Sequence, residues 1–117
     1  MDFNQQMENL KKESGEIPKP LELLGKLDES MVVNHISDKK FVYGKETVPP
    51  KYKALLALSA AIALDSQACI LNNTKAARKA GASVQEIMET FAIAKFSKAA
   101  TTLSSSLPAM EWLVNNK

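Results

Sequence analysis

Cysteine and histidine are almost absent from this 117-residue chain, which contains one of each, Cys69 and His35. A single cysteine cannot form an internal disulfide, so the sequence lacks the disulfide framework of small secreted domains. The amino-terminal stretch MDFNQQMENLKKESGE also lacks the apolar core of a signal peptide. We therefore expect a cytoplasmic protein. One cysteine, one histidine and scattered carboxylates provide no ligand set at metal-site spacing, which predicts no metal.

Long apolar runs and blocks of like charge are absent too. The longest apolar stretch, residues 54–64, is interrupted by Ser59 and is far shorter than the roughly 20 residues that span a bilayer. The formal net charge of +2 comes from 15 basic and 13 acidic residues spread along the chain, with no basic stripe between exposed aromatics. The sequence therefore predicts neither a membrane nor a nucleic-acid partner. No glycine-rich phosphate loop occurs, and no cofactor is expected.

Glycine and proline are scarce, with four and five residues, and no segment alternates β-branched residues over the length of a strand. Alanine and leucine are frequent. The sequence thus predicts an all-α fold, a compact bundle of about five to six helices in a single domain over residues 1–117. A peripheral N-terminal helix is expected within residues 1–16, since Phe3, Met7 and Leu10 lie at helical spacing.

The spacing of apolar residues predicts four longer helices, over residues 19–36, 49–64, 66–80 and 83–100. Gly25 is a candidate break in the first of them, and residues 37–48 are expected to connect it to the second. Near the end of the chain, the serine cluster at 104–106 and Pro108 either kink a last helix or separate it into a short piece. The sequence leaves both possibilities open.

The helix ends carry the clearest local signals. Asp65 and Ser66 are predicted to cap the helix that follows them, because their side-chain oxygens can accept from its first N–H groups. Gly81 suits a left-handed position after that helix, and Ser83 and Glu86 have the spacing of a capping box. The next helix is predicted to bury an apolar stripe that consists of Val84, Ile87, Met88 and Phe91.

About half of the chain shows a specific order of motifs, VPPKYKALLALSAAIALDSQACI followed by NNTKAARKAGASVQEIMETFAIAKF. This order resembles the carboxymuconolactone decarboxylase and alkylhydroperoxidase D-like family. Members typically show a proline-led helix with RELIAL, a Cys-x-x-Cys motif at the next helix start, a histidine four residues on and an AGAT-x-EEI turn. The resemblance implies an alkylhydroperoxidase D-like helical fold.

The family pattern is incomplete at the residues that carry its chemistry. The family cysteines fall on Ser66 and Cys69, and the histidine falls on Asn73. The glutamate of the preceding helix falls on Ala54. In the dithiol peroxidases, one thiolate attacks the peroxide and the other resolves the sulfenic acid, while the glutamate and histidine relay protons. Three of these four residues are replaced, so the dithiol mechanism is not expected for this chain acting alone.

Cys69 remains a candidate thiol, with two alternatives. A one-cysteine mechanism would use an external thiol for resolution, helped by a helix N-terminus worth roughly 0.3–1 kcal/mol to a thiolate and opposed by Asp65. Otherwise Cys69 is a buried, inert packing residue. Ser66 is either a nucleophile or a helix cap, and no histidine lies near it in sequence. Asn72 and Asn73 either orient a ligand or face solvent.

Three basic residues are weak candidates for binding. Lys95 and Lys98 extend the apolar stripe of the helix at 83–100, so they could project into a cavity beside Cys69 and there bind a carboxylate or lower the thiol pKa. Alternatively, they reach solvent from the edge of the core or pair across a subunit boundary. His35 is either a general base or a residue that ends a helix.

Two functions stay open on this evidence. The first is an enzyme, with a peroxidase (peroxiredoxin-type) activity through Cys69 or an action on a small carboxylated compound, as in the lactone decarboxylases, which need neither metal nor organic cofactor. The second is a non-catalytic helical oligomer. The resemblance implies a homo-oligomer, a trimer or hexamer, under both. The alanine-rich central helix and the apolar C-terminal segment agree, because they offer more apolar surface than one small core needs.

Overall fold

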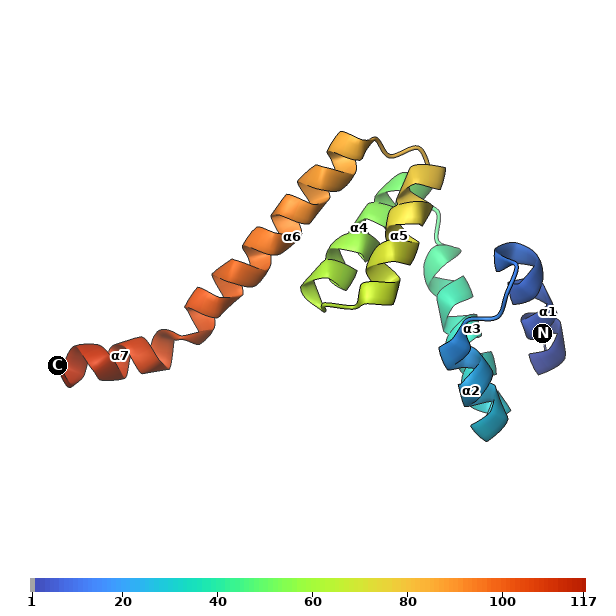
Figure 1. Cartoon of the computed structure of the whole chain (residues 1–117), viewed down its shortest axis with the longest axis horizontal. Helices are drawn as coiled ribbons and strands as arrows, with labels where there is room; N and C mark the ends of the chain where they lie inside the picture. Colours follow the sequence, from blue (N-terminus) through green and yellow to red (C-terminus); the bar gives the residue numbers. More distant parts are fainter. Residues whose placement is uncertain (1) are drawn as a thin grey trace. The chain divides into compact units, whose positions relative to one another are not determined.

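A computed structural model describes residues 2–117, in which all regular structure is helical (Figure 1). The chain divides into two compact units, Met1–Thr47 and Val48–Lys117. The first unit contains α1 (Phe3–Ser14), α2 (Lys19–Leu27) and α3 (Glu29–Tyr43). The second contains α4 (Pro50–Ala63), α5 (Gln67–Lys79), α6 (Val84–Ser105) and α7 (Leu107–Asn115). The predicted all-α class is confirmed, while the single domain over residues 1–117 stays a prediction. Met1 lies outside the described residues.

The helix expected within residues 1–16 is α1, which begins with a capping box between Asp2 and Gln5. It packs against α3. Its Gln6 is buried, and the side-chain amide of Gln6 donates a long, 3.5 Å hydrogen bond to the carbonyl of Val33 in α3. With Val32 and Ile36, which are buried on α3, this contact forms the interior of the first unit.

The break in the helix predicted over residues 19–36 lies at Asp28, and the prediction of a break at Gly25 is wrong. The Asp28 carboxylate accepts hydrogen bonds from the backbone N–H and the hydroxyl of Ser30, at 3.0 and 2.6 Å, and so starts α3. The Ser30 hydroxyl also lowers the pKa of Asp28. Gly25 lies inside α2, where an added Cβ would be 2.9 Å from the ring of Phe3. Gly25 therefore serves packing, since it makes room for the ring.

The expected connection over residues 37–48 is also shorter than predicted. Helix α3 continues through Tyr43, and the backbone N–H of Gly44 still donates to the carbonyl of Lys40 at 2.8 Å. No glycine or proline interrupts the stretch between Ile36 and Gly44, so nothing stops the helix earlier.

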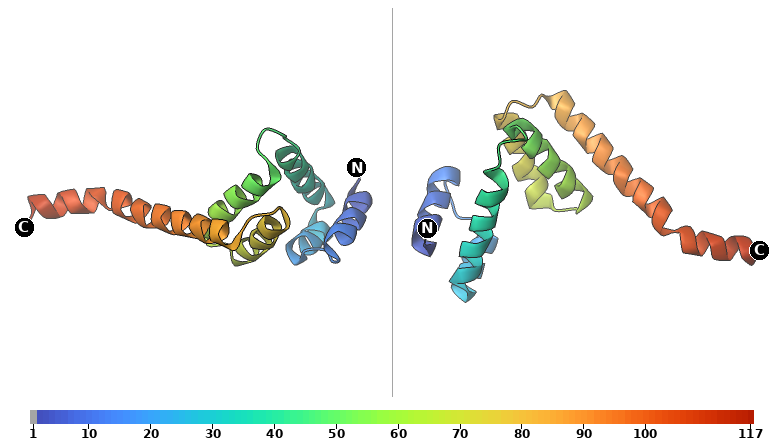
Figure 2. Two further views of the ribbon diagram at one scale, coloured as in Figure 1. Left: turned by 90° about the horizontal axis from the view of Figure 1, so that it is seen from above. Right: turned by 180° about the vertical axis from the view of Figure 1, so that it is seen from behind.

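The second unit is built on the helix pair α4 and α5, which lie side by side in every view (Figures 1 and 2). Its interior consists almost wholly of small residues, because the buried side chains are Ala54, Leu58, Ala61, Ala77, Ala82 and Ala94. Alanines let two helix backbones approach closely, and most of the apolar area buried here comes from their close contact. Helix α6 packs on α4 as well.

The turn between α5 and α6 has the predicted design. Gly81 adopts the left-handed conformation, with φ 97°, and the N–H of Ala82 donates to the carbonyl of Ala77 at 2.9 Å, which closes a Schellman motif. Ser83 and Glu86 then form the capping box of α6, at 2.9 and 3.0 Å. The predictions for these helix ends are confirmed.

The apolar stripe predicted for the next helix is wrong for most of its members. Ile87 is half-buried against the cluster of Ala54, Ala77 and Ala82, but Val84, Met88 and Phe91 are exposed. Helix α6 runs to Ser105, five residues beyond the predicted end at residue 100, and a separate helix, α7, follows after Ser106. Pro108 lies in the first turn of α7, where its missing N–H is not needed.

Candidate functional site

The chain passes from α4 to α5 through Asp65 and Ser66, the point where the family pattern has its first cysteine. Asp65 is left-handed, with φ 61°, and the N–H of Ser66 donates to the carbonyl of Ala61 at 3.0 Å. Asp65 therefore ends α4 in a Schellman motif. Ser66 occupies the N-cap position of α5, but its side chain accepts no capping hydrogen bond. The predicted capping of α5 by Asp65 and Ser66 is wrong, because their backbone is used to close α4.

Cys69 lies in the first turn of α5, and its side chain is exposed. The alternative that it is a buried packing residue is wrong for the chain as described here. Within residues 2–117, Cys69 has neither a hydrogen bond from its side chain nor an ion pair. Access to the thiol is open, but nothing beside it activates the sulfur except the helix N-terminus.

The other positions of the family pattern are divided between surface and core. Ser66 and Asn73 are half-buried, and their spacing of three and four residues from Cys69 places all three along one side of α5. Ala54 belongs to the core, where it is 7% exposed and packs with Ala77 and Ala82. A buried methyl group thus stands where the resemblance implies a proton-transferring carboxylate.

The weaker candidates do not gather around Cys69. Asn72 is exposed on α5, and Lys95 and Lys98 are exposed on α6. His35 is exposed on α3, which belongs to the first unit. Their proposed roles in ligand binding or base catalysis stay predictions.

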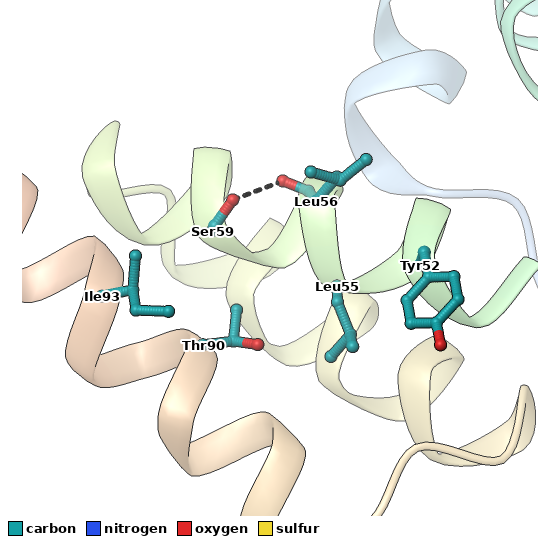
Figure 3. Close-up of a pocket in the computed structure, with 6 residues that line it drawn as sticks. All are labelled: Tyr52, Leu55, Leu56, Ser59, Thr90 and Ile93. Carbon is teal, nitrogen blue, oxygen red and sulfur yellow. Dashed lines mark hydrogen bonds between the residues drawn. The ribbon is translucent and has the colours of Figure 1, made fainter. Parts of the chain in front are cut away.

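An apolar groove of about 280 Å³ lies between α4 and α6. It is lined by Tyr52, Leu55, Leu56, Ser59, Thr90 and Ile93 (Figure 3). The hydroxyls of Ser59 and Thr90 donate to carbonyls of their own helices, at 2.7 and 2.8 Å. None of the predicted site residues lines the groove. The sequence gave no sign of it, because its two walls are more than 30 residues apart in the chain.

One ion pair links the beginnings of α4 and α6. The ammonium of Lys51 lies 3.1 Å from the Glu86 carboxylate, which also accepts from the backbone N–H of Ser83. The Ser83 N–H, and after it the Lys51 ammonium, hold the pKa of Glu86 below its ordinary value. The hydrogen bond to Glu86 raises the pKa of Lys51 in turn. Glu86 therefore fastens α6 to α4 while it caps α6.

Glu86→Gln is expected to lower the melting temperature at pH 7 through loss of this ion pair. A carboxyl whose pKa is depressed in the folded state stabilises above its unfolded pKa, and loses that effect as the pH falls through the folded value. The difference between wild type and variant should thus shrink below about pH 4. Thermal unfolding followed by circular dichroism at pH 7 and pH 3 measures it. Glu89→Gln, an exposed change on the same helix, is the control, and an equal loss there would refute the role of Glu86.

Metal and membrane contacts find no support in the part of the chain that the structure describes. No group of three or more histidine, cysteine, aspartate or glutamate side chains in residues 2–117 is arranged to hold a metal ion. Among the helices of this same range, none is both long and apolar enough to cross a membrane.

The geometry defines an all-α protein with a closely packed helix pair, an exposed thiol at the start of the second helix of that pair and a long following helix. The family model for the carboxymuconolactone decarboxylase family matches residues 37–112. Because this match covers more than half of the sequence, the chain belongs to the carboxymuconolactone decarboxylase family. The resemblance inferred from the motif order is confirmed. A search of curated proteins found no match to the sequence.

Proposed function

We propose that this chain is a helical homo-oligomer that keeps the family scaffold without the dithiol peroxidase reaction. The observation that carries the proposal is the burial of Ala54 against Ala77 and Ala82. A core methyl group cannot relay a proton, and the hydroxyl of Ser66 cannot resolve a sulfenic acid. Without the carboxylate and the second thiol, the two steps that follow peroxide attack have no residue to perform them.

Support for an oligomer comes from the apolar surface of the chain. Large apolar side chains are exposed on every helix of the second unit, including Leu64, Phe91, Phe96 and Trp112. Soluble monomers rarely expose apolar patches of more than a few hundred Å². The trimer or hexamer implied by the resemblance is the finer form of this proposal. A cytoplasmic location is proposed with it, on the ground that a lone cysteine suits a reducing compartment.

A second candidate, a one-cysteine peroxidase, is favoured by the exposure of Cys69. In that reaction the thiolate attacks one peroxide oxygen, the O–O bond breaks and the alcohol leaves, which oxidises Cys69 to a sulfenic acid. One external thiol then forms a mixed disulfide and releases water. A second external thiol releases the Cys69 thiolate and carries away the disulfide, so the oxidant is the peroxide and the reductant is the pair of thiols.

Cys69→Ser decides between the two candidates. If the chain is non-catalytic, wild type and variant will consume hydrogen peroxide or an alkyl hydroperoxide at the same background rate in excess dithiothreitol. The assay follows peroxide loss, and mass spectrometry of the wild type shows whether Cys69 gains oxygen. A rate at least ten-fold above that of Cys69→Ser would reject the non-catalytic proposal in favour of the one-cysteine enzyme. The serine variant should keep the oligomeric state, since the exposed thiol supports no packing.

A further inference from the structure

The C-terminal part of the chain carries an exposed apolar seam at the 3–4 spacing of a heptad repeat. We call it the C-terminal seam; it consists of Ile93, Phe96, Ala100, Leu103, Leu107, Met110 and Val114. All of its large members are exposed, with Phe96 at 73% and Leu103 at 66%. No residue of α7 is buried. The second half of α6 and all of α7 therefore present a helical face that their own unit leaves uncovered.

The polar groups around this seam are suited to burial. Residues 99–117 contain only two charged side chains, Glu111 and Lys117. The hydroxyl groups of this stretch are bonded within their own helix. They donate to the carbonyl four residues earlier from Thr101, Thr102, Ser104 and Ser106, at 2.9, 3.2, 3.1 and 2.7 Å. A helix whose hydroxyls are already bonded loses little when water is removed from its surface.

We propose that the C-terminal seam pairs in antiparallel orientation with the same seam of a second copy of this chain. The proposal rests on the homo-oligomer proposed above and specifies its contact surface. In an antiparallel pair, the first apolar position of each heptad faces the second of the partner. That register sets Ile93 opposite Met110, and Phe96 opposite Leu107, of the second copy. It also sets Ala100 opposite Leu103, a small residue against a large one, which suits close packing.

The groove between α4 and α6 is continuous with the seam and favours the antiparallel orientation. Ile93 belongs to both, because it is also one of the residues that line the groove. In the antiparallel register, the end of the second copy's α7, with Trp112 and Val114, lies beyond Ile93 and over the groove. One contact then covers the uncovered seam and the groove together. A parallel pair would set Ile93 against Ile93 and leave α7 away from the groove.

The size and charge of the seam favour a second copy over a different protein. Its exposed apolar side chains offer on the order of 700 Å², close to the roughly 800 Å² per partner of a standard stable interface. A two-fold contact uses the same patch on both chains, and an apolar patch can complement itself. Glu111 is the sole charged side chain between residues 99 and 116. The seam thus lacks the charges by which a different partner is usually selected.

Leu103→Asp tests the pairing, because it places a carboxylate in the middle of the seam in both copies. Size-exclusion chromatography with light scattering should show the wild type as a dimer or hexamer, and the variant with its mass reduced by half or more. Ser105→Asp is the matched control, since it adds the same charge on the opposite side of α6 and should keep the wild-type mass. Circular dichroism checks that both variants remain helical.

The outcomes separate this inference from the proposed oligomer. A monomeric wild type would refute both. A wild-type trimer, which has no two-fold axis, would refute the antiparallel pair alone. So would an oligomer that Leu103→Asp leaves intact.

Cross-linking keeps the inference testable if Leu103→Asp fails to fold. In a Cys69→Ser background, Ile93→Cys and Met110→Cys are made as separate full-length variants and oxidised alone or mixed. Antiparallel pairing predicts a disulfide-linked dimer in the mixture and little in either variant alone. Cross-linking of each variant alone, with no gain on mixing, would indicate a parallel pair, and no cross-link in any sample would indicate that the seam meets something other than itself. Either result overturns the inference.

Discussion

Ala54→Glu is expected to destabilise the folded chain by about 2–4 kcal/mol, although it restores the residue type that the family has at this position. Ala54 is buried on α4 against Ala77 and Ala82, with Leu55 and Ile87 around them. A glutamate side chain needs space that this cluster does not have, and its carboxylate would lose water without gaining a partner. Urea unfolding followed by circular dichroism at pH 7 measures the loss.

The pH dependence of Ala54→Glu identifies the cause of the loss. Burial raises the pKa of a carboxyl group, because the charged form loses its water. The part of the destabilisation that comes from charge should therefore shrink as the pH falls toward about 4, the unfolded value. The part that comes from overpacking should stay. Ala60→Glu, an exposed change on the same helix, should stay within about 0.5 kcal/mol of wild type. If Ala54→Glu is as stable as this control, position 54 opens to a site and the proposed core role is wrong.

The parts of the fold that were predicted correctly depend on residues that are neighbours in sequence. Gly81, Ser83 and Glu86 form the turn between α5 and α6 through contacts that span a few residues, so local rules are sufficient there. The break between α2 and α3 shows where such rules fail. Gly25 is the better helix breaker by propensity, but the ring of Phe3 fills the space beside it, and tertiary contact overrides propensity.

The apolar pattern of α6 explains the main error in the predicted core. Periodicity shows that one side of a helix will be buried, but it does not show what buries it. Ile87 meets the interior of its own unit, whereas Met88, Phe91 and Phe96 remain exposed. An interface between copies uses the same spacing as a core. For this reason, side chains that look like core in the sequence can belong to the surface of a single chain.

The candidate site was located correctly in the sequence but not in its surroundings. The motif order identified the family and the position of Cys69, yet the exposure of the thiol depends on how α5 packs against α4. The groove depends on Leu55 and Ile93, whose proximity follows from the packing of α6 on α4. Both features arise from contacts distant in sequence, and neither leaves a pattern that a single sequence shows.

Leu58→Ala is expected to cost about 3 kcal/mol of folding free energy, within the range of roughly 2–5 kcal/mol for buried leucine truncations. Leu58 is 1% exposed and is the largest fully buried side chain of the second unit. Alanines make up the rest of that interior, so no large neighbour can move to fill the cavity. Urea unfolding of the full chain measures the loss, and a change below 1 kcal/mol would mean that α4 moves to close the space.

Leu56→Ala is the matched control, since Leu56 is on the same helix but is 60% exposed and lines the groove. In a separated chain it should cost well under 1 kcal/mol. If a second copy covers the groove, its effect should grow with protein concentration, because assembly adds to apparent stability by mass action. The cost of Leu58→Ala arises inside one chain and should be nearly the same at all concentrations. The two leucines thus separate what the core contributes to stability from what the second copy contributes.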